Sequence, residues 1–118
     1  MNRHSYDPER ASALLPLLRS ITGEIRERME AVDLLERELQ GLGRARHERE
    51  RRGEIEAELA VQRRELRVAR RELERLGCQL DEDHPLRVLI PGVGGTLDRG
   101  FAWSPLDERL ESVALLSR

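Results

Sequence analysis

The sequence predicts a mainly α-helical protein, built on a long antiparallel helical hairpin that resembles a coiled coil and carries a small C-terminal β-sheet. Two long stretches predict the hairpin, because their apolar residues recur at alternating spacings of three and four, along one face of a helix. After residue 80 the pattern changes to short apolar runs separated by prolines and glycines, which favours strands and turns. With 118 residues, we expect one domain.

The first stretch predicts a helix over about residues 8–42. Asp7 is a good N-cap residue, and Pro8 suits the first helical position. Pro16 falls near the end of the second turn, so it should bend the helix or set off its first segment. The apolar seam then continues to the glycines at 41 and 43, through Leu18, Ile21, Ile25, Met29 (or Arg28), Val32, Leu35, Leu39 and Leu42.

The second stretch predicts a helix over about residues 54–76. Gly77 follows it, in the position where a left-handed C-cap glycine is expected. A single polar residue in a seam often fixes register or oligomeric state, and we expect that structural role for Gln62. The seam consists of Ile55, Leu59, Gln62, Leu66, Ala69, Leu73 and Leu76.

The Arg-rich tip of the hairpin, residues 43–53, has two interpretations. Residues 44–52 have good helix propensity but no apolar face, so they form either the start of a longer second helix or a mobile loop. We favour the loop, because it lets residues 20–42 pair with 54–76, two matched stretches. A tight turn at Leu42 would set apolar side chains against polar ones.

Residues 81–118 predict a small β-rich appendix within the same domain as the hairpin of residues 1–80. Residues 86–90 and 101–103 read as strands, and residues 110–116 as either a third strand or a short terminal helix. The resulting β-hairpin or three-stranded sheet should cover an apolar cluster at the near end of the helical hairpin, formed by Leu14, Leu15 and Leu18.

Two features of this appendix suggest binding but have simpler explanations. Residues 91–96, Pro-Gly-Val-Gly-Gly-Thr, look like a phosphate loop, yet another strand follows them where a helix would be required. We therefore interpret them as a hairpin turn. Trp103 is either an exposed anchor for a partner or the main core residue of the sheet, and we favour the core.

Composition excludes several classes of chemistry. All 21 basic residues are arginine, which excludes a Schiff-base lysine and a Walker A motif. The single cysteine, Cys78, excludes an intramolecular disulfide and a paired-cysteine metal motif. The N-terminus has no apolar signal region and no stretch approaches 18 apolar residues, so we expect a cytoplasmic protein without a membrane partner.

An arginine row is the best candidate interaction site. Arg64, Arg67, Arg71 and Arg75 fall within about 80° of one another on a helix, opposite the seam. With the arginines of the tip they form a cationic strip. Such a strip suits a solvated face with i,i+4 ion pairs, an acidic protein surface, or nucleic-acid phosphates. No aromatic residues lie between the arginines, so nucleic acid would be contacted through its backbone only.

A weaker candidate is a divalent-metal site in residues 78–84, which hold a thiol, three carboxylates and an imidazole. The residues concerned are Cys78, Asp81, Glu82, Asp83 and His84. We favour a polar connection, with Cys78 as a small packing residue. We assign no catalytic residue and no cofactor, because nothing accompanies Cys78 and His84 as an orienting group or an oxyanion hole.

The N-terminal run from Tyr6 to Leu18, Tyr-Asp-Pro-Glu-Arg-Ala-Ser-Ala-Leu-Leu-Pro-Leu-Leu, resembles the start of the DUF2203 family of small prokaryotic proteins. The resemblance continues through two Leu/Glu/Arg-rich helices to Gly77. The later family pattern includes an acidic residue before a proline, a cysteine before a tryptophan, and a Trp-His pair. This chain has Leu89 near Pro91, Ala102 before Trp103, and no such pair. The resemblance implies a fold and leaves the function open.

We expect a non-enzymatic protein that acts through assembly, as a homodimer or with a cytoplasmic protein partner. The reason is that Leu34, Val61 and Val68 are apolar but lie off the seams, where the hairpin cannot bury them. One alternative is an accessory nucleic-acid binder that uses the arginine row. A second alternative is a metal-dependent enzyme centred on residues 78–84.

Overall fold

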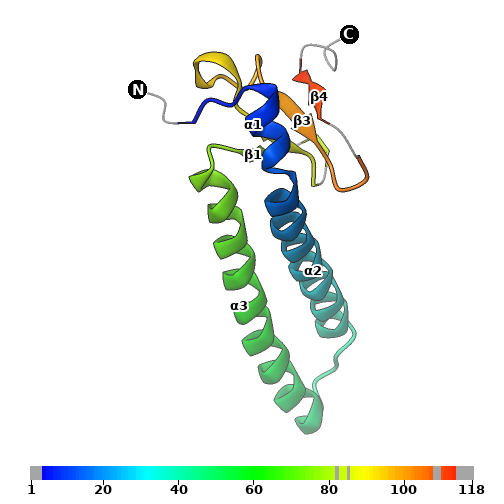
Figure 1. Ribbon diagram of the computed structural model, residues 1–118. Coiled ribbons are helices and arrows are strands. Elements are labelled where there is room, and N and C mark those ends of the chain that lie inside the picture. The colour runs from blue at the N-terminus through cyan, green and yellow to red at the C-terminus, as the bar shows by residue number, and fades with distance from the viewer. Residues whose placement is uncertain (1–3, 82, 85, 108–109, 114–118) are drawn as a thin grey trace.

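The computed structural model describes residues 4–81, 83–84, 86–107 and 110–113. It contains an antiparallel helical hairpin with a small sheet and a short helix gathered at one end, and its extents are 58 × 29 × 22 Å (Figure 1). The short helix α1 spans Pro8–Ala13, α2 spans Leu15–Gln40 and α3 spans Arg46–Arg75. None of these helices is long and apolar enough to cross a membrane. The predicted mainly helical hairpin is confirmed.

The helix ends follow the local signals in the sequence. The Asp7 side chain accepts a hydrogen bond from the Arg10 N–H, at 2.8 Å, and so caps α1. Pro16 lies in the first turn of α2 and sets off α1 as a separate segment, with Leu14 between the two helices. Gly77 ends α3 with a φ of 79°, a left-handed conformation that glycine adopts without strain.

The preferred loop over residues 44–52 is wrong, because α3 begins at Arg46 and the connection shrinks to residues 41–45. Its polar side chains find polar partners: the Arg51 guanidinium pairs with Glu38 at 2.8 Å, and Arg52 donates to the Leu42 carbonyl. The first turns of α3 extend past the end of α2, and the pairing of the two helices stays close to the expected one (Figure 1). Arg63 pairs with Glu36 at 2.7 Å, and Leu39 and Leu59 line one groove. Helix propensity, together with these contacts, outweighs the missing apolar face.

The sheet has four antiparallel strands in the order β1-β2-β3-β4, one more than predicted. The strands are β1 (Gln79–Leu80), β2 (Val88–Ile90), β3 (Phe101–Trp103) and β4 (Glu111–Ser112). Strand β1 directly follows the end of α3 and has only two residues, too few for an alternating pattern to show. The predicted turn between the second and third strands is confirmed by their antiparallel pairing.

The predicted choice between strand and helix over residues 110–116 is resolved only in part. Glu111 and Ser112 pair with Ala102 and Phe101 as a strand. Residues 114–116 lie outside the described part of the chain.

The core lies where the sheet meets the hairpin. Trp103 is completely buried there, in one cluster with Leu18, Ile25, Leu73 and Ile90. Its indole N–H donates to the Asp107 carbonyl at 3.0 Å, and the Arg19 guanidinium lies 5.2 Å from the ring centroid. Trp103 is therefore the core residue we favoured, and it offers no exposed anchor to a partner.

The seam predicts a sharp contrast between two aliphatic truncations. Ile55 is completely buried between the helices, whereas Leu34 is 65% exposed on the outside of α2. We expect Ile55→Ala to lower the free energy of unfolding by about 2–5 kcal/mol, and Leu34→Ala to change it by about 0.5 kcal/mol or less. Urea denaturation followed by circular dichroism measures both. Equal effects would mean that α3 does not pack on α2 through Ile55.

Candidate interaction surface

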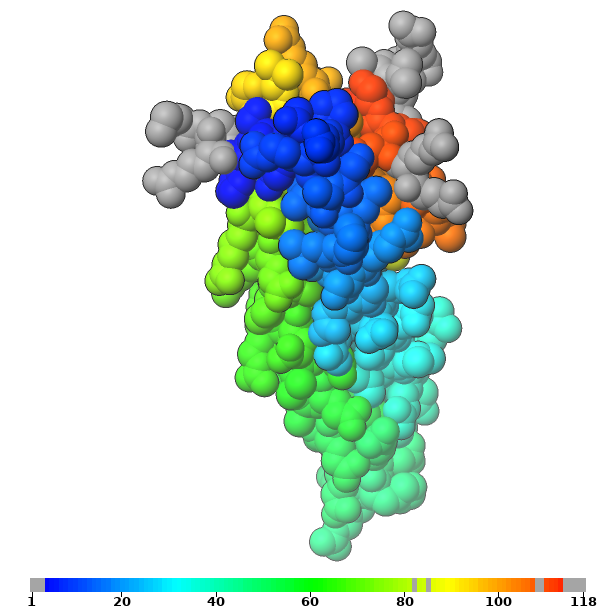
Figure 2. Space-filling model, in the orientation of Figure 1, coloured from blue at the N-terminus to red at the C-terminus, as the bar shows by residue number. Residues whose placement is uncertain are grey.

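The outer face of α3, by which we mean the line of Val61 and Val68 with the charged rows on either side of it, carries two exposed apolar side chains. Val61 is 44% exposed and Val68 is 45% exposed, and their spacing of seven positions places both on one line along the helix. The seam on the other side of α3 is buried at Ile55, Leu59, Ala69 and Leu73. In the space-filling view, α3 forms one long side of the molecule from the sheet end to the tip (Figure 2). The outer face is therefore exposed, and its edge at Val68 lines a groove with residues of α2.

The predicted arginine row borders this valine line. Arg64, Arg67, Arg71 and Arg75 are all exposed. Among the described residues, none of the four takes part in an ion pair or donates a side-chain hydrogen bond. The face laced with i,i+4 ion pairs that we considered is therefore absent from the row within the described chain.

A glutamate row borders the valine line on its other side, and we did not predict it. Glu58, Glu65 and Glu72 repeat at intervals of seven residues, which was the available sequence signal. Their carboxylates also form no ion pair with any described residue. The outer face of α3 thus presents an apolar line between a basic row and an acidic row. Neither row forms an ion pair with a described residue.

The ion pairs of the hairpin lie elsewhere. Four arginines pair with carboxylates on α2 or at the tip, and their partners are close: Arg28 with Glu24, Arg37 with Asp33, Arg51 with Glu38 and Arg63 with Glu36, at 2.7–2.9 Å. Arg28 also donates to the side-chain amide oxygen of Gln62, Oε1, at 3.1 Å, so the Gln62 side chain bonds across the seam to α2. The Arg51 guanidinium keeps the pKa of Glu38 below its usual range.

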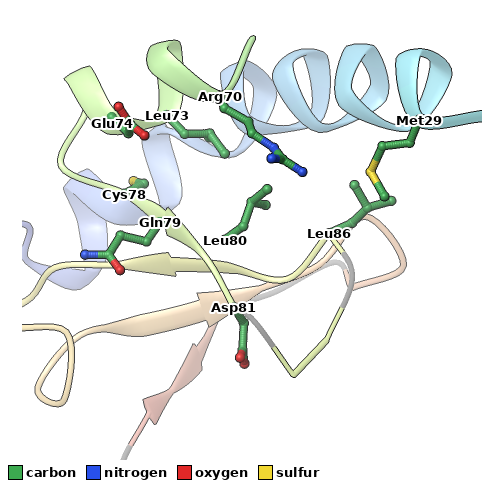
Figure 3. A pocket seen from close by; sticks show the side chains of 9 residues that line it. All are labelled: Met29, Arg70, Leu73, Glu74, Cys78, Gln79, Leu80, Asp81 and Leu86. Atoms are coloured by element: carbon green, nitrogen blue, oxygen red, sulfur yellow. The ribbon is translucent and has the colours of Figure 1, made fainter. Parts of the chain in front are cut away.

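A cleft lies on a different side of α3, where the hairpin meets β1. Its volume is about 710 Å³. Figure 3 shows Arg70 reaching over the cleft toward Met29, Leu80 and Leu86, while Glu74 lies toward the end near Cys78. The full lining is Met29, Arg70, Leu73, Glu74, Cys78, Gln79, Leu80, Asp81 and Leu86. This cleft could not be predicted from the sequence, because residues of α2, α3 and β1 and the turn before β2 all contribute to it.

The candidate metal ligands of residues 78–84 are not brought together. Cys78 is buried, whereas Asp83 and His84 are exposed. Asp81 accepts a hydrogen bond from the Asp83 N–H and lies 3.7 Å from the Arg87 guanidinium. The described residues contain no group of three side chains placed to hold a metal ion, and Glu82 lies outside them.

Burial also determines the chemistry of Cys78. The side chain is 1% exposed, and loss of solvation raises the pKa of its thiol from 9.0 to about 11. A thiol that stays protonated at neutral pH is a poor nucleophile and a poor metal ligand. The structure therefore places Cys78 as a packing residue of the core cluster, as we expected.

The comparisons with known proteins agree with the predicted resemblance. Residues 4–95 match the family model described as "Uncharacterized conserved protein (DUF2203)". The match includes all three helices and continues past Gly77 through β1 and β2. No curated protein and no solved structure matches the chain.

The raised pKa of Cys78 predicts a loss of stability in alkali. The thiol ionises from pH 9.0 in the unfolded chain but only near pH 11 in the folded protein. Ionisation of this thiol therefore leaves the free energy of unfolding unchanged below pH 9. Between pH 9 and about pH 11 it lowers that free energy by about 1.4 kcal/mol per pH unit. We expect Cys78→Ala to have a shallower decline when urea unfolding is measured at pH 8.5, 9.5 and 10.5.

Tyr6 contributes to the same decline and has to be separated from the thiol. Burial raises the pKa of its phenol, and the charge of the nearby Cys78 thiolate raises it further, so Cys78→Ala alters both contributions. Introducing Cys78→Ala into a Tyr6→Phe background isolates the thiol. Identical slopes would show that Cys78 is not buried as described.

Proposed function

The chain belongs to the DUF2203 family of uncharacterised conserved proteins, and we propose that it acts without catalysis, by binding a protein surface through the outer face of α3. The observation that carries this proposal is the valine line between a basic row and an acidic row, neither of which forms an ion pair with a described residue. A cytoplasmic site of action belongs to the same proposal, since the single cysteine has no partner for a disulfide within the chain.

The arginine row costs stability in the isolated chain. Within the row, Arg67, Arg71 and Arg75 follow one another at i,i+4 and Arg64 precedes Arg67 by three residues, and each such like-charge pair destabilises a helix by about 0.2–0.5 kcal/mol. An acidic surface placed against the row would remove this repulsion and gain the attraction of opposite charges. The repulsion within α3 therefore favours a role in which the row is covered by an acidic partner.

A second copy of the chain supplies such a partner when the two α3 helices pack in parallel on their valine lines. A twofold axis along the helices sets the basic row of each copy against the acidic row of the other. Arg64 then lies almost level with the partner's Glu65, and Arg71 with the partner's Glu72, because consecutive residues differ by only about 1.5 Å in height. Antiparallel packing would instead oppose like rows, so the pattern favours the parallel arrangement.

A second candidate function is binding to the nucleic-acid backbone, which the unpaired arginines favour. Two features oppose it. The glutamate row shares the same face and would repel phosphates, and the chain as a whole has a net charge of −2. Protein association uses both rows and the valines, whereas nucleic acid would use only the arginines.

Charge exchange tests parallel self-association. One variant carries Glu65→Arg with Glu72→Arg, and the other carries Arg64→Glu with Arg71→Glu. In each variant alone the facing rows repel, so we expect self-association about tenfold weaker than in the unaltered protein. Mixing the two variants restores opposite charges across the interface and should restore association. Sedimentation equilibrium over a wide concentration range measures each case.

A matched pair of exposed charges on the outside of α2 provides the control. Glu27→Arg with Glu30→Arg makes the same change of net charge as Glu65→Arg with Glu72→Arg, at exposed positions of another helix, and should leave association unchanged. A mixture that associates no better than either variant alone would contradict the parallel arrangement. A photo-crosslinking residue at position 68 then distinguishes the remaining cases, because protein adducts support the proposed function and nucleic-acid adducts alone contradict it.

The nucleic-acid alternative makes its own prediction. Four phosphate contacts give a slope of log affinity against log salt of about −3.6, on the order of a 100-fold loss between 50 and 200 mM salt. Arg67→Glu with Arg71→Glu should remove about half of that slope. Fluorescence anisotropy with a labelled DNA duplex measures both values. If the duplex does not bind at 50 mM salt, or if its affinity does not change with salt concentration, nucleic-acid binding is ruled out as the function.

A further inference from the structure

The cleft beside β1 has an apolar floor and one cation that reaches into it. Met29, Leu73, Leu80 and Leu86 line the floor. Arg70 extends over them and forms no ion pair with any described residue (Figure 3). Of the two acids in the lining, Asp81 forms an ion pair with Arg87. Glu74 lies toward the end of the cleft near Cys78, away from the tip of the Arg70 side chain. The centre of the cleft therefore suits an apolar group that carries a negative charge beside it.

The second feature of the cleft is an open sheet edge. Strand β1 lies at the end of the strand order, paired on one side only, with β2. The Asp81 N–H donates to the Arg87 carbonyl at 2.8 Å, and antiparallel ladders alternate between bonded and non-bonded pairs. Leu80, opposite Val88, is therefore in a non-bonded pair, and its own N–H and C=O point away from β2. They form no backbone hydrogen bond within the described chain.

The third feature is backbone strain at the cleft wall. Leu86 has a φ of 66°, the one non-glycine residue with a positive φ among the described residues. A bulky side chain in that region costs about 1–3 kcal/mol, and such strain concentrates at ligand sites. Here the strained backbone holds the Leu86 side chain in the wall of the cleft, on the Met29 side of the view in Figure 3.

We propose that this cleft binds an extended segment of a partner protein, which adds a strand to β1 at Leu80. The segment would place an apolar side chain on the floor of the cleft and a neighbouring carboxylate on Arg70. A small apolar acid would cover the apolar floor and pair with Arg70, but it would leave the Leu80 N–H and C=O without hydrogen-bond partners. A peptide satisfies all three features, because its main chain carries the complementary N–H and C=O groups.

This site is separate from the outer face of α3. Arg70 and Arg71 are neighbours in the sequence, yet about 100° of helical rotation points one into the cleft and the other onto the outer face. Both side chains are exposed, so both can be reversed in charge without burying a new group. The pair therefore separates the two sites: Arg70→Glu affects the cleft alone, and Arg71→Glu affects the outer face alone.

A random heptapeptide library displayed on phage, panned on the full chain, tests the proposal. We expect enriched sequences in which Asp or Glu adjoins Leu, Ile or Phe. A synthetic peptide of the enriched sequence should bind Arg70→Glu at least tenfold more weakly than the unaltered chain, and should bind Arg71→Glu within twofold. No enrichment, or equal effects of the two substitutions, would overturn the proposal whatever the outcome of the charge-exchange experiment on the outer face.

Amide hydrogen exchange with the same peptide tests strand addition itself. Protection of the Leu80 N–H should rise at least tenfold in the complex, whereas side-chain contact alone would leave it unchanged and would overturn strand addition. Decanoate serves as the probe for a small apolar acid. If decanoate binds in an Arg70-dependent way while no peptide is enriched, the peptide is the wrong occupant.

Discussion

The contact between the sheet and the near end of the hairpin is the interaction on which the structure depends. Strands of two or three residues bury little by themselves, and each long helix has only one apolar stripe. Trp103 joins the two parts, because it lies completely buried against the cluster that contains Leu18, Ile25 and Leu73. Each part covers the apolar surface that the other leaves open, so neither has a complete core alone.

The narrowness of this core explains why the surface is organised as it is. Away from the sheet end, burial continues only along the seam, at Ile55 and Leu59, and the tip is held by polar contacts such as Arg51 with Glu38. Packing along the seam therefore holds the helices in place, and the charges on their outer faces take no part in it. On α3, the buried seam at Leu59 and Ala69 backs the stretch that carries Val61 and Val68. An exposed face on a well-supported helix is a suitable platform for association.

Local signals in the sequence predicted the parts of the fold that local physics decides. The seams, the cap at Asp7, the break at Pro16 and the left-handed Gly77 all follow from spacing and residue type. The helical state of residues 46–53 did not follow, because they have no apolar face and the polar partner of Arg51, Glu38, is distant in the sequence. The cleft could not be predicted either, since its lining comes together only when β1 returns beside α3. Contacts between distant segments leave no periodic trace in a sequence.

The position of each arginine in the fold, and not the number of arginines, determines what it can bind. All 21 basic residues are arginine, so the residue type alone distinguishes no site. What distinguishes the sites is which guanidinium groups are already paired, as in Arg28 with Glu24, and which have no ion-pair partner among residues 4–81, 83–84, 86–107 and 110–113, as in Arg70 and Arg71. An arginine can lay its aliphatic stem on apolar surface while its planar head binds a carboxylate through two parallel hydrogen bonds. Arg70 over the cleft meets both conditions at once, whereas Arg71 beside the valine line needs only its charge. One helix can therefore present two surfaces of different specificity with the same side chain, and the rotation between consecutive residues keeps them apart.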